Sequence, residues 1–331
     1  MRTGWFEIIE NTEESQIAQC VGDILPGKSV LKFECSEGEV FDVHWFPTGQ
    51  CFAVGGTDRK VRIYDIVSGK QEKKAVLTGM NGSIMRIDFN SETRQILAAG
   101  TDFAIRIWGV DDLRARHTLT GHSDKVATAR FNADGTKVIS GSHDRTIRIW
   151  DLSTRKCLKT LFPASTVFDL VSNPLYNAMV ISGHFDKQVR LWDITSGAFV
   201  RAVELNGRVT SLSLAAAHCI FLEKQVVLCS CRDNTLSLVD LRTCRIEHEY
   251  SADQYRSTFD YTRCTLSPGF EYCAVGSADG QIFVWNLNTT KLEKVLGQGG
   301  HERPVTSVDW HPRGHCLLSV DRMKTVCLWS S

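Results

Sequence analysis

The sequence predicts an all-β fold, a seven-bladed β-propeller whose ring is closed by a strand from the N-terminal region. Three observations carry this prediction. One sequence unit recurs seven times along the 331 residues, each copy has the pattern of four short strands, and the last copy stops one strand short. Repeats are sought first because a missed repeat leads to a wrong fold.

The repeated unit ends in an aromatic or apolar anchor residue. It reads "SGSHDRTIRIWD" at 140–151 and recurs, for example, as "VGGTDRKVRIYD" at 54–65 and "VGSADGQIFVWN" at 275–286. Successive anchors lie 42 to 47 residues apart. The anchors are Tyr64, Trp108, Trp150, Trp192, Val239, Trp285 and Trp329.

Each copy has the alternation of short strands. In the third copy "VATARF" is closed by an Asp-Gly turn, "TKVISGS" follows, "TIRIW" alternates polar and apolar residues, and "CLKTLF" comes after the anchor. Period-two alternation bounded by such turns indicates antiparallel strands. Four strands in a unit of about 40–45 residues, with Gly-His and Trp-Asp marks, are typical of a WD-repeat blade.

The two ends of the chain predict how the ring closes. The seventh unit stops after its third strand, whereas "SVLKFE" at 29–34 precedes the first unit and has no blade of its own. We expect this run to be the missing outer strand, which removes an exposed edge. The predicted domains are an N-terminal extension or linker over 1–28 and the propeller over 29–331.

Composition excludes several functional classes. Lys and Arg total 38, as do Asp and Glu, so no overall charge attracts nucleic acid or an anionic membrane. We find neither a signal peptide nor a membrane span, and the twelve cysteines include no C-x-x-C pair. An intracellular, soluble chain with reduced thiols and without metal or cofactor is therefore expected.

A set resembling a hydrolytic triad lies in the third copy: His122, Ser142 or Ser140, and Asp144, with Trp150 nearby. Repetition favours a structural tetrad, because an acid recurs in every copy and enzymes do not need seven catalytic acids. We therefore predict a hydrogen-bonded tie between turn and strand, and no enzyme. The seven acids are Asp58, Asp102, Asp144, Asp186, Asp233, Asp279 and Asp321, the last followed by a turn with two extra residues.

A binding surface is the predicted functional site. The residues before the seven acids are expected to face the upper rim of the channel: Thr57, Thr101, His143, Phe185, Arg232, Ala278 and Val320. Residues that enter the innermost strands are expected beside them. We predict a peptide-binding site of Phe185, Arg208, Phe168, His143 and Thr210, because aromatic and Arg anchors carry most interface energy. Alternatively, Phe168 plugs the channel wall and Arg208 is simply solvated.

The N-terminal run "GWFEIIE" at 4–10 is a separate candidate. Trp5 and Ile8 have the spacing of an extended peptide that docks two side chains while adding a strand to a partner. A plain tether or an extra packed strand is the alternative.

Several runs resemble the C-terminal WD-repeat propeller of the autophagy-related protein 16-like family. They are "RHTLTGHSDKV" at 116–126, "SGSHDRTIRIWDL" at 140–152 and "SGHFDKQVRLWDI" at 182–194. The likeness extends from about Val30 to Trp329. By this resemblance Phe185 matches the family's upper-surface aromatic and Arg208 its nearby Lys. Phe168 stands where the family often has Asn, so a different ligand preference is expected.

The resemblance also implies a function. The family scaffolds the ligase that attaches a ubiquitin-like protein to lipid on autophagic membranes, and its propeller reads receptors. Implied partners are cytosolic peptide motifs of membrane receptors and other proteins, proton-pump subunits and ubiquitin-like proteins, but no nucleic acid. The implied location is cytoplasmic, with recruitment to autophagic and endolysosomal surfaces. A WD-repeat scaffold or substrate receptor of another multiprotein complex is the alternative.

Overall fold

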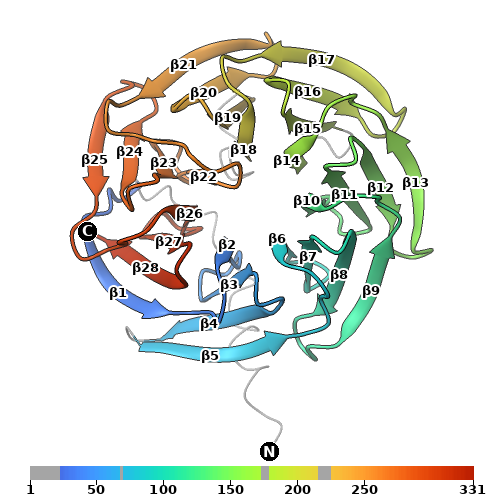
Figure 1. Cartoon of the computed structure of the whole chain (residues 1–331), viewed down its shortest axis with the longest axis horizontal. Helices are drawn as coiled ribbons and strands as arrows, with labels where there is room; N and C mark the ends of the chain where they lie inside the picture. The colour runs from blue at the N-terminus through green and yellow to red at the C-terminus, as the bar shows by residue number, and fades with distance from the viewer. Residues whose placement is uncertain (1–22, 68–69, 173–178, 215–224) are drawn as a thin grey trace, which may run out of the picture.

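The computed structural model describes residues 23–67, 70–172, 179–214 and 225–331. In these residues all regular structure is β-strand, and seven four-stranded antiparallel sheets surround a central axis (Figure 1). The predicted all-β, seven-bladed propeller is therefore confirmed. In the first six blades the strand order from the axis outward follows the chain.

Each blade begins with an innermost strand beside the channel and a second strand behind it. The innermost strands are β2 (Val40–Trp45), β6 (Ile84–Asn90), β10 (Val126–Phe131), β14 (Val167–Ser172), β18 (Val209–Leu214), β22 (Cys264–Leu266) and β26 (Val305–Trp310). The second strands are β3 (Cys51–Gly56), β7 (Gln95–Gly100), β11 (Lys137–Ser142), β15 (Met179–His184), β19 (Val226–Cys231), β23 (Tyr272–Gly276) and β27 (Leu317–Asp321).

The third strand of each blade carries the anchor, and a fourth forms the outer edge. The third strands are β4 (Val61–Val67), β8 (Ala104–Gly109), β12 (Ile147–Asp151), β16 (Gln188–Asp193), β20 (Thr235–Asp240), β24 (Ile282–Asn286) and β28 (Thr325–Ser330). The outer strands are β5 (Lys70–Leu77), β9 (Ala115–Thr120), β13 (Lys156–Leu161), β17 (Ala198–Glu204), β21 (Arg245–Ser251), β25 (Leu292–Leu296) and β1 (Lys28–Glu34).

Strand β1 closes the ring as the outer strand of blade seven. It pairs antiparallel with β28, from Lys28 opposite Ser330 to Glu34 opposite Thr325. The first and last parts of the propeller therefore share one sheet (Figure 1). This arrangement confirms the predicted closing strand and leaves β28 without a free edge.

Further hydrogen bonds join blade seven to blade one. The Tyr64 hydroxyl of β4 donates to the Cys35 carbonyl, just after β1, at 2.7 Å. Near the axis, the Trp45 backbone N–H donates to the Asp309 carboxylate at 2.7 Å. Closure therefore involves both the outer and the inner part of the blades.

The residues just before β1 also contact the propeller. The buried Asp23 carboxylate accepts a hydrogen bond from the Gly269 backbone N–H of blade six at 2.8 Å. The described part of the predicted extension 1–28 is thus packed against a blade. The Trp5 and Ile8 motif lies outside the described residues.

Among the described residues, the hydrophobic core consists of seven clusters, one at each interface between successive blades. Each anchor packs on the blade before its own; Trp150 of blade three, for example, lies with Leu97 and Ile107 of blade two. A blade buries its apolar faces only against its neighbours. The free energy of burial therefore depends on the assembled ring.

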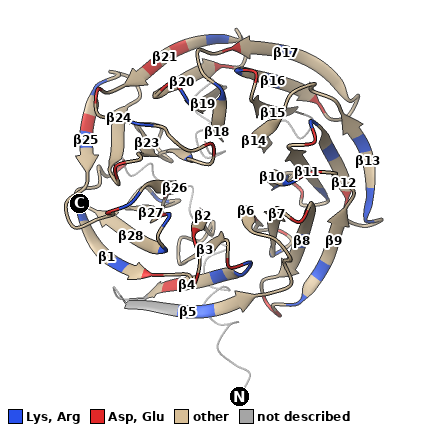
Figure 2. Ribbon diagram, in the orientation of Figure 1, with Lys and Arg blue, Asp and Glu red and all other residues tan. Residues whose placement is uncertain are grey.

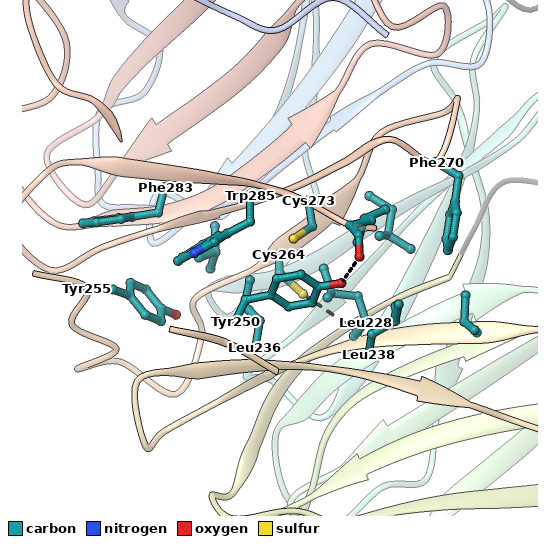
Figure 3. Close-up of a cluster of buried hydrophobic side chains, with 14 residues drawn as sticks. Leu228, Leu236, Leu238, Tyr250, Tyr255, Cys264, Phe270, Cys273, Phe283 and Trp285 are labelled. Carbon is teal, nitrogen blue, oxygen red and sulfur yellow. Dashed lines mark hydrogen bonds between the residues drawn. The ribbon is translucent and has the colours of Figure 1, made fainter. Parts of the chain in front are cut away.

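Blade five tolerates Val239 as its anchor because its interfaces are filled in other ways. Val239 lies in an aliphatic cluster between blades four and five. At the next interface Tyr250 and Tyr255 pack against Trp285, with ring centroids 6.5 and 5.8 Å away (Figure 3). The Tyr250 hydroxyl donates to the Leu287 carbonyl at 2.9 Å.

A β-bulge occurs near the start of the innermost strand in six blades. In blade four the register shifts between Val167 and Asp169, so Phe168 is the extra residue. Equivalent shifts occur in blades one, two, three, five and seven. A bulge redirects side chains locally, and here it lies at the face that also carries the turns between second and third strands, which we call the upper face.

Charged residues of both signs are interspersed around the ring (Figure 2). This distribution agrees with the zero net charge of the chain. Within the described residues no helix is long and apolar enough to cross a membrane.

Deleting residues 1–35 should destabilise the whole propeller, whereas deleting residues 1–22 should not. The longer deletion removes the β1 ladder and the apolar contacts of Leu31 and Phe33, so we expect a loss above about 3 kcal/mol. Urea unfolding followed by fluorescence measures both variants. Equal stability of the two deletions would contradict closure by β1.

Candidate functional site

The polar set of blade three forms a chain of hydrogen bonds. His122 Nδ1 lies 2.8 Å from the Asp144 carboxylate, and His122 Nε2 lies 2.8 Å from Ser140 Oγ. The Trp150 indole N–H donates to the same Oγ at 2.8 Å. The loop before β10 is thereby tied to the turn after β11 and to the anchor on β12.

The serine of this network is Ser140, and the prediction of Ser142 is corrected. Both serines lie in β11, but Ser142 ends the strand beside the turn and donates to the backbone carbonyl of Lys125 at 2.9 Å. Ser140 lies deeper, level with the imidazole and the indole, and can therefore contact both.

This arrangement is unsuited to catalysis because it is closed to solvent. Ser140 is fully buried, and His122 is 6% exposed. Burial lowers the pKa of His122, which keeps the imidazole neutral. Burial opposes ionisation of Asp144, but hydrogen bonds from Thr146 and His122 outweigh it and lower the pKa of that carboxyl. The network therefore satisfies buried polar groups.

Blade seven repeats the network with another set of residues. His301 lies 2.9 Å from the Asp321 carboxylate and 2.6 Å from Ser319 Oγ. The Trp329 indole N–H donates to Ser319 Oγ at 2.7 Å.

The register of blade seven differs from the prediction. Its serine-to-tryptophan spacing is ten residues, the same as in blade three, so the turn has no extra residues. Asp321 ends β27 at the position of Ser142, and Met323 occupies the place of the turn acid. Arg322 takes the upper-face position that was assigned to Val320, which is fully buried.

Blades one, two and four stabilise their turn acid with an arginine from the third strand. The pairs are Arg62–Asp58, Arg106–Asp102 and Arg190–Asp186. Blades one and two lack the Gly-His dipeptide, so the guanidinium replaces the imidazole as partner of the acid. In blade four the His184 imidazole contacts Ser182 Oγ at 2.7 Å, while Arg190 pairs with the turn acid. This explains the Arg in "VRIY" of blade one, "IRIW" of blade two and "VRLW" of blade four, whereas Arg148 in the "IRIW" of blade three lies over the Trp150 ring at 5.8 Å.

Phe185 is exposed on the upper face. It begins the turn between β15 and β16, where its backbone N–H donates to the Thr166 carbonyl at 3.1 Å. Its side chain points outward and the residue is 53% exposed. The turn geometry requires a hydrogen-bonded backbone at this position but no aromatic side chain.

A rigid base lies under Phe185. Phe168 is 4% exposed, and its ring centroid is 6.3 Å from that of Phe185. His143 meets the other side of Phe168 edge-on at 5.2 Å. Burial, with a smaller contribution from Lys125, lowers the pKa of His143 to about 4, so this base is uncharged at neutral pH.

Arg208 lies beside Phe185 as predicted, but its guanidinium also lies close to an acidic side chain. The guanidinium carbon is 5.1 Å from the centre of the Phe185 ring. Arg208 Nε lies 3.6 Å from the Asp260 carboxylate, and Arg232 Nε lies 3.0 Å from the same oxygen. Arg208 is therefore held between an aromatic face and an acid, and the alternative of a simply solvated side chain does not describe it.

The structure divides the five predicted contact residues into two groups. Phe185, Arg208 and the half-buried His143 are accessible from the upper face. Phe168 supports them from below. Thr210 is fully buried and donates to the Ser230 carbonyl at 3.1 Å, so it cannot touch a ligand directly.

The segment 252–263, between β21 and β22, crosses the channel mouth on the upper face. Lys125 of blade three donates to the Tyr261 hydroxyl at 2.8 Å, and the Tyr261 ring centroid is 5.8 Å from that of Phe41 of blade one. Arg322 of blade seven lies over the Phe259 ring at 5.2 Å. One loop thus contacts blades on opposite sides of the ring.

Sequence reasoning missed this loop and therefore Asp260. The signal was present in "SADQYRSTFDYTR" at 251–263, which has three aromatic and four charged residues and no strand alternation. Only the three-dimensional position of the loop brings Asp260 to the two arginines.

Six segments of the chain match the family described as WD domain, G-beta repeat. They are residues 27–65, 71–109, 114–151, 155–193, 256–286 and 291–330. The chain belongs to the WD-repeat family. The stretch between the fourth and fifth matches contains blade five, whose anchor is Val239.

This WD-repeat protein is also similar over nearly its whole length to autophagy proteins. It is 40% identical to autophagic-related protein 16.2 of Caenorhabditis elegans and 43% identical to protein Atg16l2 of Homo sapiens. The alignments cover 93% and 95% of this chain but 57% and 49% of those proteins. Autophagy-related protein 16 of Arabidopsis thaliana is 31% identical, over 99% of this chain and 60% of the relative.

The chain therefore spans about half the length of the curated relatives that it matches. The similarity supports an autophagy-related WD-repeat protein, and the propeller is a fold suited to protein–protein interaction.

Asp144→Ala should damage folding without selectively removing a function. It leaves the His122 imidazole and nearby buried donors without their acceptor, which costs about 2–4 kcal/mol. Asp151→Ala is the matched control, because Asp151 caps an exposed turn and its loss should leave the free energy of unfolding nearly unchanged. Urea unfolding compares them. A stable Asp144→Ala protein would contradict the structural role.

Proposed function

We propose that this WD-repeat protein reads short partner peptides on its upper face, around Phe185 and Arg208, as part of an autophagy-type conjugation scaffold. Through such peptides it would help direct lipidation of a ubiquitin-like protein to membranes. Its role is binding, not catalysis. The exposed Phe185, supported by a buried aromatic and bordered by an arginine, is the observation that carries this proposal.

The chemistry of the surface limits the ligand. Phe185 on Phe168 offers an apolar contact that costs little conformational entropy, because Phe168 is already fixed. Arg208 can donate two hydrogen bonds to a carboxylate in one plane. The fitting ligand is an extended peptide with an aromatic or aliphatic anchor and an acidic residue close by.

Asp260 affects how strongly an acidic ligand group would bind. Its carboxylate is already near Arg208 and Arg232, so an acidic ligand group would compete with it for the same donors. The net gain from the charged contact is then smaller than from a free arginine, and the apolar contact at Phe185 supplies most of the affinity.

The cellular part of the proposal rests on the relatives. Their names place them in autophagy. Proposed partners are cytosolic tails of membrane receptors, proton-pump subunits and ubiquitin-like proteins. The proposed location is the cytoplasm, with recruitment to autophagic and endolysosomal membranes.

Phe185→Ala should weaken peptide binding by about 2 kcal/mol, or roughly 30-fold, without changing the fold. Peptides from cytosolic receptor tails would be screened on an array, and the tightest binder used in isothermal titration. Phe103→Ala is the matched control, because Phe103 is another exposed upper-face turn aromatic, 43% exposed, in blade two. Equal effects of the two variants would contradict a specific site, and membrane lipidation in cells should fall only with Phe185→Ala.

Arg208→Ala and Asp260→Asn should change the affinity of an acidic peptide in opposite directions. The first removes the cation and flattens the salt dependence, and the second removes the internal competitor and strengthens binding. The same peptide with Gln in place of its acidic residue should respond to neither change. If Arg208→Ala and Phe185→Ala both bind like the unaltered chain, the upper-face site is wrong.

A further inference from the structure

The channel contains a cavity on the side opposite Phe185. Its volume is about 470 Å³, and it is lined by innermost strands and by the turns that follow them, at Pro47, Asn132, Pro268 and Pro312. These turns lie at the other end of the blades from the upper face. We call this space the lower cavity; it is separate from the proposed peptide site.

Arg263 forms the inner end of the lower cavity. It directly precedes β22, where the bulge residue stands in the other blades. Its guanidinium reaches across the channel to the carbonyls of Met85 and Ala127, both at 3.4 Å. One of its nitrogens lies 3.0 Å from Asp169, a fully buried acid that does not line the cavity.

The carboxylates of the lining already accept hydrogen bonds from the protein. Each receives a backbone N–H from the next blade: Asp42 from Ile87 at 2.8 Å, Asp88 from Phe131 at 2.8 Å and Asp309 from Trp45 at 2.7 Å. Each also has a side-chain donor: Ser307 at 3.2 Å, Arg130 at 2.8 Å and His44 at 3.0 Å, respectively.

The arginines are not satisfied in the same way. Arg86 is 8% exposed, and its nearest acids, Asp42 and Asp169, lie at 3.5 and 4.0 Å. The Nε atoms of Arg86 and of the 2% exposed Arg263 have no hydrogen-bond partner among the described residues. Arginine carries five donors and no acceptor, and buried unpaired donors are costly.

The lower cavity is therefore lined by arginines with donors that lack hydrogen-bond partners, and by carboxylates that already accept hydrogen bonds from the protein. Four cations, Arg86, Arg130, Arg263 and His44, stand against four acids when Asp169 is included. Burial opposes protonation of His44, but Asp309 and Asp88 outweigh it and raise its pKa to about 9. Asp169 is not part of the lining, so the lining itself carries one cation more than acids, and the missing partner must supply acceptors together with negative charge.

We propose that the lower cavity binds a small oxyanion, a carboxylate or a phosphate, whose oxygens accept hydrogen bonds from the Arg86 and Arg263 guanidiniums. Its volume lies within the range of small-molecule sites, which leaves room for a small anion with water. Arg130 and His44 stand on the lining strands of blades three and one. The oxyanion is either free in solution or the terminal carboxylate of a protein inserted from the lower face.

Titration calorimetry on the whole chain tests this site. The probes are inorganic phosphate, citrate and acetyl-Gly-Gly-Gly with a free carboxylate, with the amidated tripeptide and sodium chloride at matched ionic strength as controls. We expect saturable binding of at least one oxyanion and none of the controls. Phosphate or citrate alone would indicate a free anion, and the tripeptide acid would indicate a protein terminus.

Arg86 variants decide whether binding occurs in the lower cavity. Arg86→Met should weaken it about tenfold or more. Arg86→Lys keeps the charge but loses the Nε donor and the planar fork, so it should also lose affinity and remains informative if Arg86→Met unfolds. Arg201→Met, on the exposed outer strand β17, should bind like the unaltered chain. No saturable binding, or binding unchanged in folded Arg86→Lys, would overturn the proposal.

Discussion

Ring closure is the constraint on which the rest of this propeller depends. Each blade buries its apolar faces only against two neighbours, and the seven hydrophobic clusters lie between blades. A blade without a neighbour would expose one such face to water. β1 prevents this by completing blade seven, and the Asp309 contact to Trp45 holds the inner strands at the same junction. Stability is therefore shared around the ring.

The closed ring also fixes the two ends of the channel. Bulges on the innermost strands bring Phe168 under Phe185, and the upper surface is completed by a loop that contacts blades on opposite sides. At the other end, side chains from several blades surround the lower cavity. Neither feature belongs to a single blade. Each exists only when blades far apart in sequence are held at fixed positions.

Much of the propeller architecture could be predicted because the sequence is periodic. The anchors, the turn acids and the spare run at 29–34 predict seven blades and their closure, since each depends on local spacing. Errors arose where spacing is ambiguous. Ser140 and Ser142 point to the same side of β11, so they differ only in how far each lies from the turn. The sequence places Asp321 in a turn because an Arg follows it, as an Arg follows Asp144 in blade three. In the structure Asp321 instead ends a strand. Asp260 could not be predicted, because its two arginine partners lie just before β18 and just after β19, outside its own loop.

Native-state hydrogen exchange, resolved strand by strand, tests the central claim of cooperative closure. If the ring opens only as a whole, the protected amides of β26 and β2, which flank the junction, should exchange with the same opening free energy as those of β10 and β14 on the far side. A distinctly lower opening free energy in blades seven and one would contradict this account, because the ring would then open locally at the β1 junction while the other blades remain folded.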